Sequence, residues 1–392
     1  MYVHIDCNSF FASCEIATRV GIADKPVVVA NDNEAGGGII LALNDHAKRL
    51  GLKRGNPLFQ VRGLLKANDV VICPVDHKKY HAISKRIMDN VQRQEIILDF
   101  VQYSVDEFFG MIPVEDPQEV RHYVAKVRDH IVETTGIPVG CGCSLTYTLA
   151  KTATYFAKHF SGYDGICVLP ADKIDKALDL LPIADVWGIG RQHRKKLEQQ
   201  RISSALDFVS LPEERVGEIL GTMGLRTYRE LNGIPSIDLH RSEMQQSIMQ
   251  SRTFPFMITE KGAMAEHLRG FVASCCSKLR AQNGVCSGVS VFVATNRHRQ
   301  DLPQYHNSMS SRFVEPTSDT PLVTKRVLSI LESLFRSGYQ YKQAGVVLTG
   351  IKEVKGMQLD LFSAEEDAKR RKLMEVADMI NQKFGDDTIN FG

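Results

Sequence analysis

Acidic residues stand beside short apolar runs at two distant places in the chain. Asp6 follows the run 3–5, and Asp106 and Glu107 lie inside the strand-forming run 101–109. Carboxylates within an apolar strand are energetically costly unless something compensates their charge. Mg²⁺ is a natural compensator, because it prefers oxygen ligands and binds few protein carboxylates beside substrate phosphates. Two such ions about 3.5–4 Å apart activate a hydroxyl and neutralise a leaving pyrophosphate, so these residues predict nucleotidyl transfer.

An alternative for Asp106 and Glu107 is a hairpin turn that leaves both carboxylates in water. An Asp-Glu dipeptide on its own favours that alternative. Asp6, in a second strand, favours the metal site instead. The metal site requires the fold to bring all three side chains together.

The elements that must position these residues alternate along the first 170 residues. Apolar runs at 3–5, 26–29 and 38–41 are typical of short buried strands. Residues 44–50 and 120–131 have helical patterns instead. This interleaving predicts an α/β or α+β core.

The rest of the chain divides at residues 232–236, where Asn, Gly, Pro and Ser form a linker-like break. Residues 170–231 lack strand patterns and are predicted to form short helices with Gly-rich turns. Residues 243–351 mix β-rich runs with two helical segments, which predicts a separate α+β domain. A capping box at 363–366 predicts a final, charged helix.

Composition indicates a soluble protein in a reducing compartment. The net charge of +2 over 392 residues does not by itself indicate a nucleic-acid binder, although residues 232–350 carry 4 Lys and 9 Arg against 8 acidic residues. No apolar run approaches the roughly 20 residues needed to cross a bilayer, and no signal peptide is evident. The nine cysteines lack disulfide-framework or zinc spacing, which predicts reduced thiols and a cytoplasmic location.

Four segments, in one order, resemble the motifs of Y-family DNA polymerases. Residues 6–15 (Asp-Cys-Asn-Ser-Phe-Phe-Ala-Ser-Cys-Glu) resemble the opening motif, and residues 104–107 (Ser-Val-Asp-Glu) resemble the second metal motif. Residues 140–158 are similar to the segment that leads to the triphosphate-binding lysine. Residues 186–190 (Val-Trp-Gly-Ile-Gly) resemble the helix-hairpin-helix of the thumb.

Within that family the chain resembles the UmuC branch, the catalytic subunit of DNA polymerase V, more than the DinB branch. Asn8 stands where many members have a second Asp, and the segments 293–296, 303–308 and 316–320 are similar to the UmuC little finger. Residues 358–362 (Gln-Leu-Asp-Leu-Phe) resemble a sliding-clamp-binding motif at the place where UmuC proteins carry one. The resemblance therefore spans nearly the whole chain.

The resemblance implies an α+β right-hand polymerase fold with a C-terminal little-finger domain. The expected parts are a palm (1–10 and 77–168), fingers (11–76), a helical thumb with a helix-hairpin-helix (169–231), a linker (232–242), a little finger (243–351) and a tail (352–392).

The resemblance also assigns roles in the active site. Asp6, Asp106 and Glu107 are the expected catalytic ligands of two Mg²⁺ ions, joined by the backbone carbonyl of Cys7. Phe11 matches the steric gate that leaves no volume for a ribose 2′-hydroxyl. Lys151 is expected to support the site. The expected nucleotide-binding residues are Phe10, Phe11, Lys48 and Lys158.

Other residues are expected to contact macromolecules. Glycines in the turn at 188–190 expose amides that suit a DNA phosphate. An amphipathic stripe (Leu373, Val376, Ile380 and Phe384) fits either a UmuD′-like partner or packing on the little finger, and both alternatives stay open. The expected DNA-binding residues are Gly188, Ile189, Gly190, Arg252, Arg297, Arg299 and Arg312, and the expected clamp-binding residues are Gln358, Leu361 and Phe362.

The function implied by the resemblance is template-directed translesion DNA synthesis of low fidelity. Such an enzyme acts in DNA repair and mutagenesis during an SOS-type damage response. Its expected partners are primer-template DNA, a deoxynucleoside triphosphate, a sliding clamp, a UmuD′-like subunit and a RecA filament. The alternatives are a DinB-type polymerase that acts without UmuD′, a non-catalytic clamp-tethered DNA-binding scaffold, and another palm enzyme such as a nucleotidyl cyclase. The lesion specificity, error spectrum and oligomeric state stay open.

Overall fold

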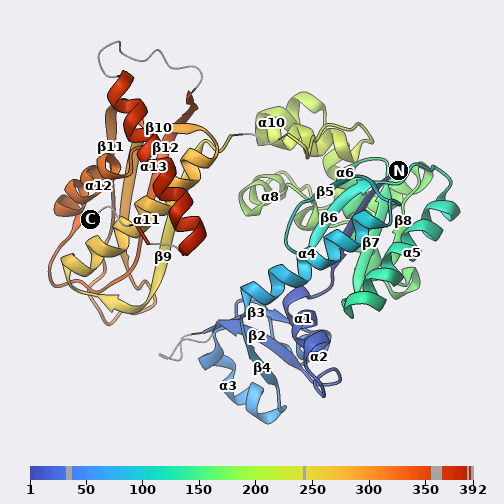
Figure 1. The fold of residues 1–392 in the computed structure, drawn as a ribbon. Helices are drawn as coiled ribbons and strands as arrows, with labels where there is room; N and C mark the ends of the chain where they lie inside the picture. The colour runs from blue at the N-terminus through green and yellow to red at the C-terminus, as the bar shows by residue number, and fades with distance from the viewer. Residues whose placement is uncertain (32–37, 242–243, 355–363, 386–387, 390–392) are drawn as a thin grey trace. The chain divides into compact units, whose positions relative to one another are not determined.

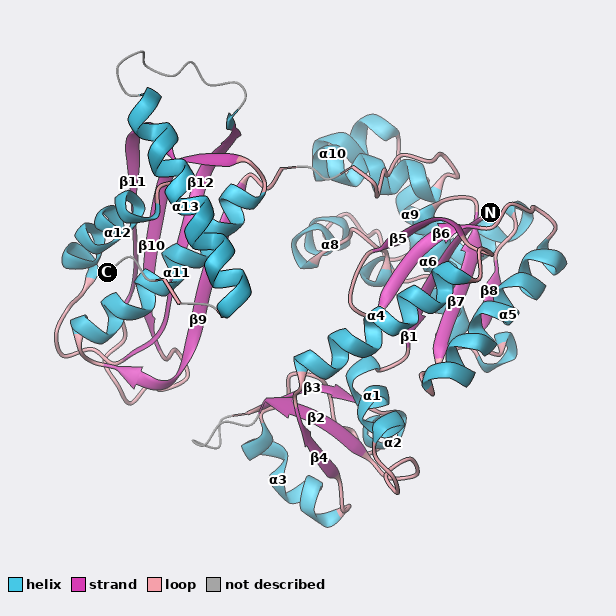
Figure 2. Cartoon of the chain, in the orientation of Figure 1, coloured by secondary structure: helices cyan, strands magenta, loops and turns pink. Residues whose placement is uncertain are grey.

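The computed structural model describes residues 1–31, 38–241, 244–354, 364–385 and 388–389. They form two compact units, Met1–Arg241 and Ser242–Gly392 (Figure 1). Helices and sheets mix in both units, as Figure 2 shows, and this confirms the predicted α+β class. Within the described parts of the chain, none of the helices has the length and apolar composition of a bilayer-spanning segment.

The first unit is built on a five-stranded sheet with strand order β5-β6-β1-β7-β8. Residues Val3, Ile5 and Cys7 of β1 point into a core that includes α4 and α5. The alternate residues of β1 face α6, because successive side chains of a strand leave opposite faces. The elements are β1 (Tyr2–Cys7), α4 (His77–Arg93), β5 (Leu98–Gln102), β6 (Glu107–Met111), α5 (Pro117–Thr135), β7 (Val139–Ser144), α6 (Tyr147–His159) and β8 (Ile166–Val168).

The close approach of α6 to β7 depends on glycine. A Cβ atom on Gly142 would lie 2.2 Å from the backbone nitrogen of Thr154 and 2.3 Å from the backbone oxygen of Ala150. Only a residue without a side chain fits there, so the glycines of β7 set the distance between this helix and the sheet.

A smaller three-stranded sheet, with order β3-β2-β4, follows the first helix. Asn44 caps α2 by accepting a hydrogen bond from the backbone N–H of Ala47, which confirms the helix predicted there. The elements are α1 (Phe10–Thr18), β2 (Val27–Asn31), β3 (Ile39–Leu43), α2 (Asp45–Arg49), α3 (Leu58–Ala67) and β4 (Val71–Pro74).

Helices complete the first unit; those over 174–209 are short, as the sequence predicts, whereas Glu213–Leu231 is 19 residues long and is interrupted at Gly221, which has φ of +68°. Glu230 is fully buried, and its carboxylate accepts hydrogen bonds from the backbone N–H groups of Thr148, Ser236 and Ile237. The beginning of the predicted linker is therefore held against the first turn of α6. The helices are α7 (Ile174–Leu180), α8 (Arg191–Glu198), α9 (Ala205–Val209) and α10 (Glu213–Leu231).

The second unit is an antiparallel four-stranded sheet with order β11-β10-β12-β9. Helices α11 and α12 share an apolar core with one face of this sheet. The elements are β9 (Ser247–Ile258), α11 (Lys261–Ala281), β10 (Gly284–Thr295), β11 (His306–Thr317), α12 (Thr320–Leu334), β12 (Tyr341–Glu353) and α13 (Ala364–Phe384).

Helix α13 packs on the second unit through a face other than the predicted stripe. Met374 and Ala377 are buried, and Asp378 forms a bidentate ion pair with Arg280 of α11, with N–O distances of 2.7 and 2.8 Å. Three residues of the predicted stripe, Leu373, Val376 and Phe384, are exposed. The predicted clamp-binding residues Gln358, Leu361 and Phe362 lie outside the described residues.

Candidate active site

The register between β1 and β6 brings the three predicted carboxylates together. Asp6 is the antiparallel partner of Glu107, and the backbone N–H of Cys7 donates to the carbonyl of Asp106 at 2.8 Å. Residues about 100 positions apart in the sequence therefore meet at one end of the five-stranded sheet. The backbones of the three predicted ligands therefore converge, whereas the ligand atoms that lie within 4.8 Å of one another belong to Asp6, Glu107 and His4 and not to Asp106.

The position of Asp106 and Glu107 corrects one prediction. Asp106 does not lie inside a strand but in the turn between β5 and β6, whereas Glu107 is the first residue of β6. The Ser104 hydroxyl donates to the Asp106 carboxylate at 2.9 Å, a local contact of the kind that competes with a strand ladder. The turn does not leave the pair in water, however, because the Glu107 side chain is only 13% exposed.

Glu107 is held by two cation-capable neighbours. Its Oε2 lies 2.8 Å from Nζ of Lys151 and 3.1 Å from Nε2 of His4. Burial by itself would raise the pKa of Glu107, but the hydrogen bonds from His4 and Lys151 outweigh burial and lower that pKa to about 2. Glu107 is therefore a carboxylate at neutral pH.

Asp106 shows the opposite balance. Burial raises its pKa, the Ser104 hydrogen bond lowers it, and the negative charges of Asp6 and Glu107 raise it further. Three acidic groups thus crowd one half-buried place. Such crowding is stabilised by cations, so the donor set fits divalent metal ions.

Lysine ammonium groups supply positive charge at this place. Lys158 forms an ion pair with Asp6, while Lys151 pairs with Glu107. Gly140, the β7 partner of Asp6, makes room for Lys158, because a Cβ atom there would lie 2.7–2.8 Å from the lysine methylenes. Lys158, predicted to bind the triphosphate, therefore contacts a predicted metal ligand.

His4 and Thr154 are site residues that the sequence patterns did not identify. His4 is buried, and its Nδ1 lies 2.8 Å from Oγ1 of Thr154, on the far side of the ring from Glu107. Burial lowers the pKa of His4, which favours a neutral ring that orients Glu107. Donor atoms of His4, Asp6 and Glu107 lie within 4.8 Å of one another. The sequence did contain a signal for His4: it is a polar residue inside an apolar strand, and it lies on the same face of that strand as Asp6.

The predicted steric gate is stacked on a second aromatic ring. Phe11 lies parallel to Tyr80, with ring centroids 4.4 Å apart and an interplanar angle of 15°. The Tyr80 hydroxyl donates to the buried carboxylate of Glu15 at 2.7 Å. Ion pairs from Arg19 and Lys79 compensate the charge of Glu15. Sequence reasoning missed Tyr80, which has no local pattern to mark it.

The other predicted nucleotide-binding residues lie in different surroundings. Phe10 is 3% exposed and belongs to the core between the sheet and α4. Lys48 lies on α2, where its Nζ is 2.8 Å from Asp45 in an exposed ion pair. Phe10 and Lys48 as nucleotide contacts stay predictions.

The Gly188-Ile189-Gly190 segment forms a tight turn before α8. Gly188 has φ of +91°, and a Cβ atom there would lie 2.5 Å from the Thr227 hydroxyl. Ile189 is buried, and Gly190 is the N-terminal cap of α8. A cavity of about 610 Å³ lies beside the turn, lined by residues 184–190, Lys151 and Thr152.

The predicted DNA-binding arginines lie in the second unit and are exposed. Arg252 lies on the edge strand β9 and pairs in register with the core residue Ala344. Its side chain therefore projects from the sheet face that carries the helices. Arg299 pairs with Asp301 in the same loop. Arg312 on β11 pairs in register with Gly288, and its side chain projects from the opposite face of the sheet.

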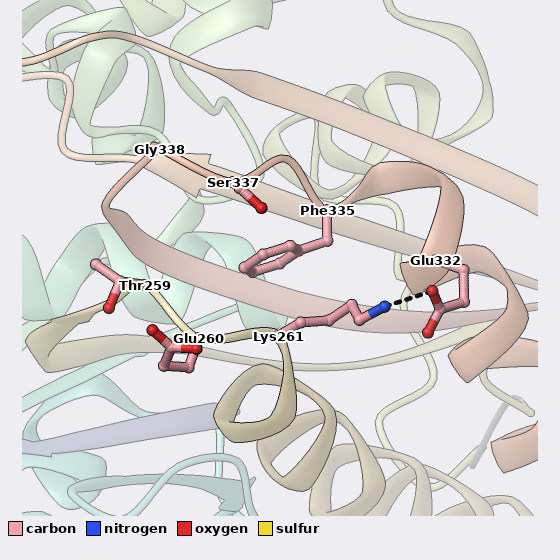
Figure 3. A pocket seen from close by; sticks show the side chains of 7 residues that line it. All are labelled: Thr259, Glu260, Lys261, Glu332, Phe335, Ser337 and Gly338. Atoms are coloured by element: carbon pink, nitrogen blue, oxygen red, sulfur yellow. Dashed lines mark hydrogen bonds and ion pairs between the residues drawn. The ribbon is translucent and has the colours of Figure 1, made fainter.

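A second cavity, of about 400 Å³, lies in the second unit near the start of α11 (Figure 3). An ion pair between Lys261 and Glu332, 2.6 Å apart, crosses its lining. The predicted site residues that the structure describes do not line this cavity. The candidate active site is therefore the carboxylate end of the five-stranded sheet.

Comparisons with known proteins match nearly the whole chain. Residues 5–155 match the impB/mucB/samB family, and residues 245–361 match the impB/mucB/samB family C-terminal domain. Protein UmuC of Salmonella typhimurium is 32% identical over 100% of this chain and 93% of its own length. MucB of Escherichia coli is 30% identical over 98% of this chain and 90% of its own length. DNA polymerase IV of Oceanobacillus iheyensis is 25% identical, over 98% and 90% of the two chains.

Solved polymerase structures share the fold. A Y-family DNA polymerase chimera, Dbh-Dpo4(243-245)-Dbh, superposes with a TM-score of 0.69 at 20% identity, covering 90% of this chain and 99% of its own. An insertion ternary complex of Dbh DNA polymerase gives a TM-score of 0.54 at 21% identity, over 90% and 99% of the two chains. These likenesses confirm the predicted right-hand fold with a little finger.

Proposed function

The chain belongs to the impB/mucB/samB family of Y-family DNA polymerases, and we propose that Asp6, Asp106 and Glu107 carry its chemistry. The protein is a DNA-directed DNA polymerase of the UmuC-like kind. Its function is translesion DNA synthesis in the SOS-type damage response, in which nucleotides are added to a primer 3′-hydroxyl with low fidelity.

The register between β1 and β6 is the observation that carries the assignment of the chemistry. It places Asp6 opposite Glu107 and ties Cys7 to Asp106. Scaffold proteins without catalysis have no need to gather three acidic groups in a half-buried place, where their charges repel one another. The gathering therefore favours an enzyme over the DNA-binding scaffold.

The fold of this family implies dependence on divalent metal. We assign two Mg²⁺ ions to Asp6, Asp106 and Glu107 with the backbone carbonyl of Cys7. When bound, such ions stabilise the charge on the reacting oxygens as Lewis acids. The protein's own part is to hold the carboxylates in place, and His4 does so for Glu107 through its contact with Thr154.

Lys158 and Phe11 act on the incoming nucleotide in this proposal. Lys158 exchanges Asp6 for oxygens of the triphosphate, since its ammonium is already at the site and lysine binds phosphate as a point charge. Phe11 blocks the 2′-hydroxyl of a ribonucleotide. Its stacking on Tyr80 holds the Phe11 ring in position. Lys48 and Phe10 complete the proposed nucleotide site.

The remaining parts follow the right-hand arrangement. We assign the palm to 1–10 and 77–168, the fingers to 11–76, the thumb to 169–231 and the little finger to 243–351. Primer-template DNA would contact Gly188, Ile189 and Gly190 in the thumb, and Arg252, Arg297, Arg299 and Arg312 in the little finger.

Protein partners are also part of the proposal. We propose that Gln358, Leu361 and Phe362 bind a sliding clamp, and that a UmuD′-like subunit and a RecA filament regulate the enzyme. A pull-down with and without a UmuD′ homologue separates this proposal from a DinB-type polymerase. Loss of capture would contradict the UmuD′ part alone.

Primer extension on undamaged and abasic templates tests the chemistry. Asp106→Ala is expected to lower the Mg²⁺-dependent rate by about 10³-fold or more, because several kcal/mol of transition-state stabilisation depend on the ligand set. Asp172→Ala, which removes an exposed carboxylate beside Lys173, is the matched control and should extend normally. Normal extension by Asp106→Ala would refute the assignment.

A further inference from the structure

Lys151 lies between a carboxylate and three aromatic rings. Its Nζ is 2.8 Å from Oε2 of Glu107. The same nitrogen is 5.1 Å from the ring centroid of Tyr103, 5.2 Å from that of Trp187 and 5.8 Å from that of Phe109. These distances lie within the range of cation–π attraction. We call Tyr103, Phe109 and Trp187 the ring cage.

The ring cage joins distant parts of the first unit. Tyr103 belongs to the turn between β5 and β6, Phe109 to β6, and Trp187 to the segment just before Gly188. Trp187 stacks on Phe109, with centroids 5.5 Å apart and planes at 30°, and meets Tyr103 edge-on at 5.5 Å. Phe109 lies on the strand that Glu107 begins. The segment proposed to hold DNA thus contributes a ring to the surroundings of a proposed metal ligand.

We propose that Trp187 is a positioning residue for Glu107, and that it acts through Lys151. This inference rests on the proposed role of Glu107 as a metal ligand. Once a divalent cation compensates Glu107, the Lys151 ammonium is repelled by that cation and loses its partner. The ring cage gives the ammonium a favourable place nearby, so the lysine does not need to return to Glu107 and compete with the metal.

The proposal predicts the direction of each effect. Removal of the Lys151 charge should tighten cation binding, because a competing ammonium is gone. Removal of the Trp187 ring should weaken cation binding, because the lysine then stays on Glu107. Lys158 offers a contrast, since it pairs with Asp6 and, among the described residues, the cation–π contacts at this site all belong to Lys151.

The sequence contains a single tryptophan, so Trp187 fluorescence reports on the ring cage directly. Mg²⁺ is titrated into the full chain without DNA or nucleotide while the emission is recorded. A saturable change in emission is expected for the wild type. Lys151→Met should lose that change, and the control variant Lys173→Met, which removes an exposed lysine paired with Asp172, should keep it.

Cation affinity is measured in parallel from the electron paramagnetic resonance signal of free Mn²⁺. Trp187→Leu is expected to weaken Mn²⁺ binding by about 2- to 30-fold, the range that corresponds to the usual cation–π strength. Trp187→Phe should recover part of this loss because it restores a ring. Lys151→Met should bind Mn²⁺ more tightly than the wild type.

The outcomes separate the inference from the proposed function. If the wild type binds Mn²⁺ and Glu107→Gln weakens that binding, the metal site stands. The role of Trp187 is overturned if Trp187→Leu then binds Mn²⁺ as tightly as the wild type does. It is also overturned if the Trp187 emission of the wild type does not change when Mg²⁺ is added. If the wild type binds no Mn²⁺, both the metal site and the inference fail.

Discussion

The two large sheets of the molecule place their charged side chains in different ways. In the five-stranded sheet, Asp6 and Glu107 are half-buried, face one another across a strand pair, and are each held by a lysine. In the four-stranded sheet, Arg252 and Arg312 are exposed at different places. One sheet fixes a few charges in position, whereas the other spreads charge over a surface.

The difference follows from what each region is proposed to do. Catalysis depends on distances between reacting groups, and a shift of 1 Å at such a site lowers rates severely. The Asp6–Glu107 pairing meets this demand, because a one-residue slip of β1 would turn Asp6 away from α6. Phosphate contacts position a duplex but tolerate variation, so a surface that binds DNA backbone needs charge more than exact placement.

The largest expected effect breaks the packing behind the fixed site. Gly142→Ala should destabilise the first unit by about 3 kcal/mol, because the new Cβ atom would clash with backbone atoms of Thr154 and Ala150 rather than with a movable side chain. Gly63→Ala is the matched control: it lies in α3 with no atom of the described residues within 4 Å of its Cβ position, and should stabilise by about 0.5–1 kcal/mol. Urea unfolding followed by Trp187 fluorescence measures both changes. Equal stability of the two variants would contradict the close packing of α6 on β7.

The second effect asks whether the four-stranded unit also contains a fixed charge. The Arg280–Asp378 pair, with side chains 8% and 18% exposed, ties α13 to α11. Arg280→Met should cost about 2–3 kcal/mol, since it leaves Asp378 half-buried without its partner. Hydrogen exchange of the α13 amides should therefore accelerate by about 30- to 150-fold. Lys261→Met, which breaks an exposed pair with Glu332, should leave this exchange almost unchanged. Unchanged exchange in Arg280→Met would show that the pair does not hold the helix.

Local patterns in the sequence predicted the elements better than the contacts between them. The strands around Asp6, the helix after Asn44 and the separate C-terminal domain follow from apolar spacing and capping residues. The acidic residues of the candidate site were also identifiable, because a carboxylate beside an apolar strand is energetically costly unless its charge is compensated. Their convergence then depended on a strand register that no local pattern specifies.

The residues that sequence reasoning missed are those whose partners are far away in the chain. His4 contacts Thr154, 150 positions later, and Tyr80 contacts Glu15, 65 positions earlier. Asp106 was placed in a strand because its neighbours are strand formers, whereas its Ser104 contact favours the turn. The sequence left open whether the stripe of α13 packs on the little finger: Leu373 and Val376 are exposed, and the helix is held instead through the Asp378 ion pair with Arg280.

The third effect tests the proposed steric gate at Phe11. Phe11→Ala should reduce discrimination against ribonucleotides by about 10- to 100-fold, because removal of the ring opens volume for a 2′-hydroxyl. Tyr80→Leu should reduce discrimination by about 2- to 10-fold, since it leaves Phe11 in place but removes the ring that supports it, together with the hydroxyl that donates to Glu15. The measurement is the ratio of kcat/KM for deoxy- and ribonucleotides in primer extension. Phe59→Ala, an exposed ring on α3, is the control. Unchanged sugar discrimination in Phe11→Ala would contradict the gate.

The smallest expected effect belongs to the spread charges of the second unit. Arg312→Ala should weaken primer-template binding by about 3- to 10-fold and lower the slope of log K against log salt by about 0.9, as expected for one lost phosphate contact. Arg252→Ala should have a smaller effect, because the Arg252 side chain projects from the sheet face that carries the helices. Arg269→Ala, on α11, is the control and should leave the slope unchanged. Fluorescence anisotropy of a labelled duplex over a salt series measures all three variants.

If Arg252→Ala weakens binding more than Arg312→Ala, the duplex lies along the edge strand β9. If any of these variants abolished binding, the charges of the four-stranded sheet would be as fixed as those of the active site, and the contrast between the two sheets would not hold.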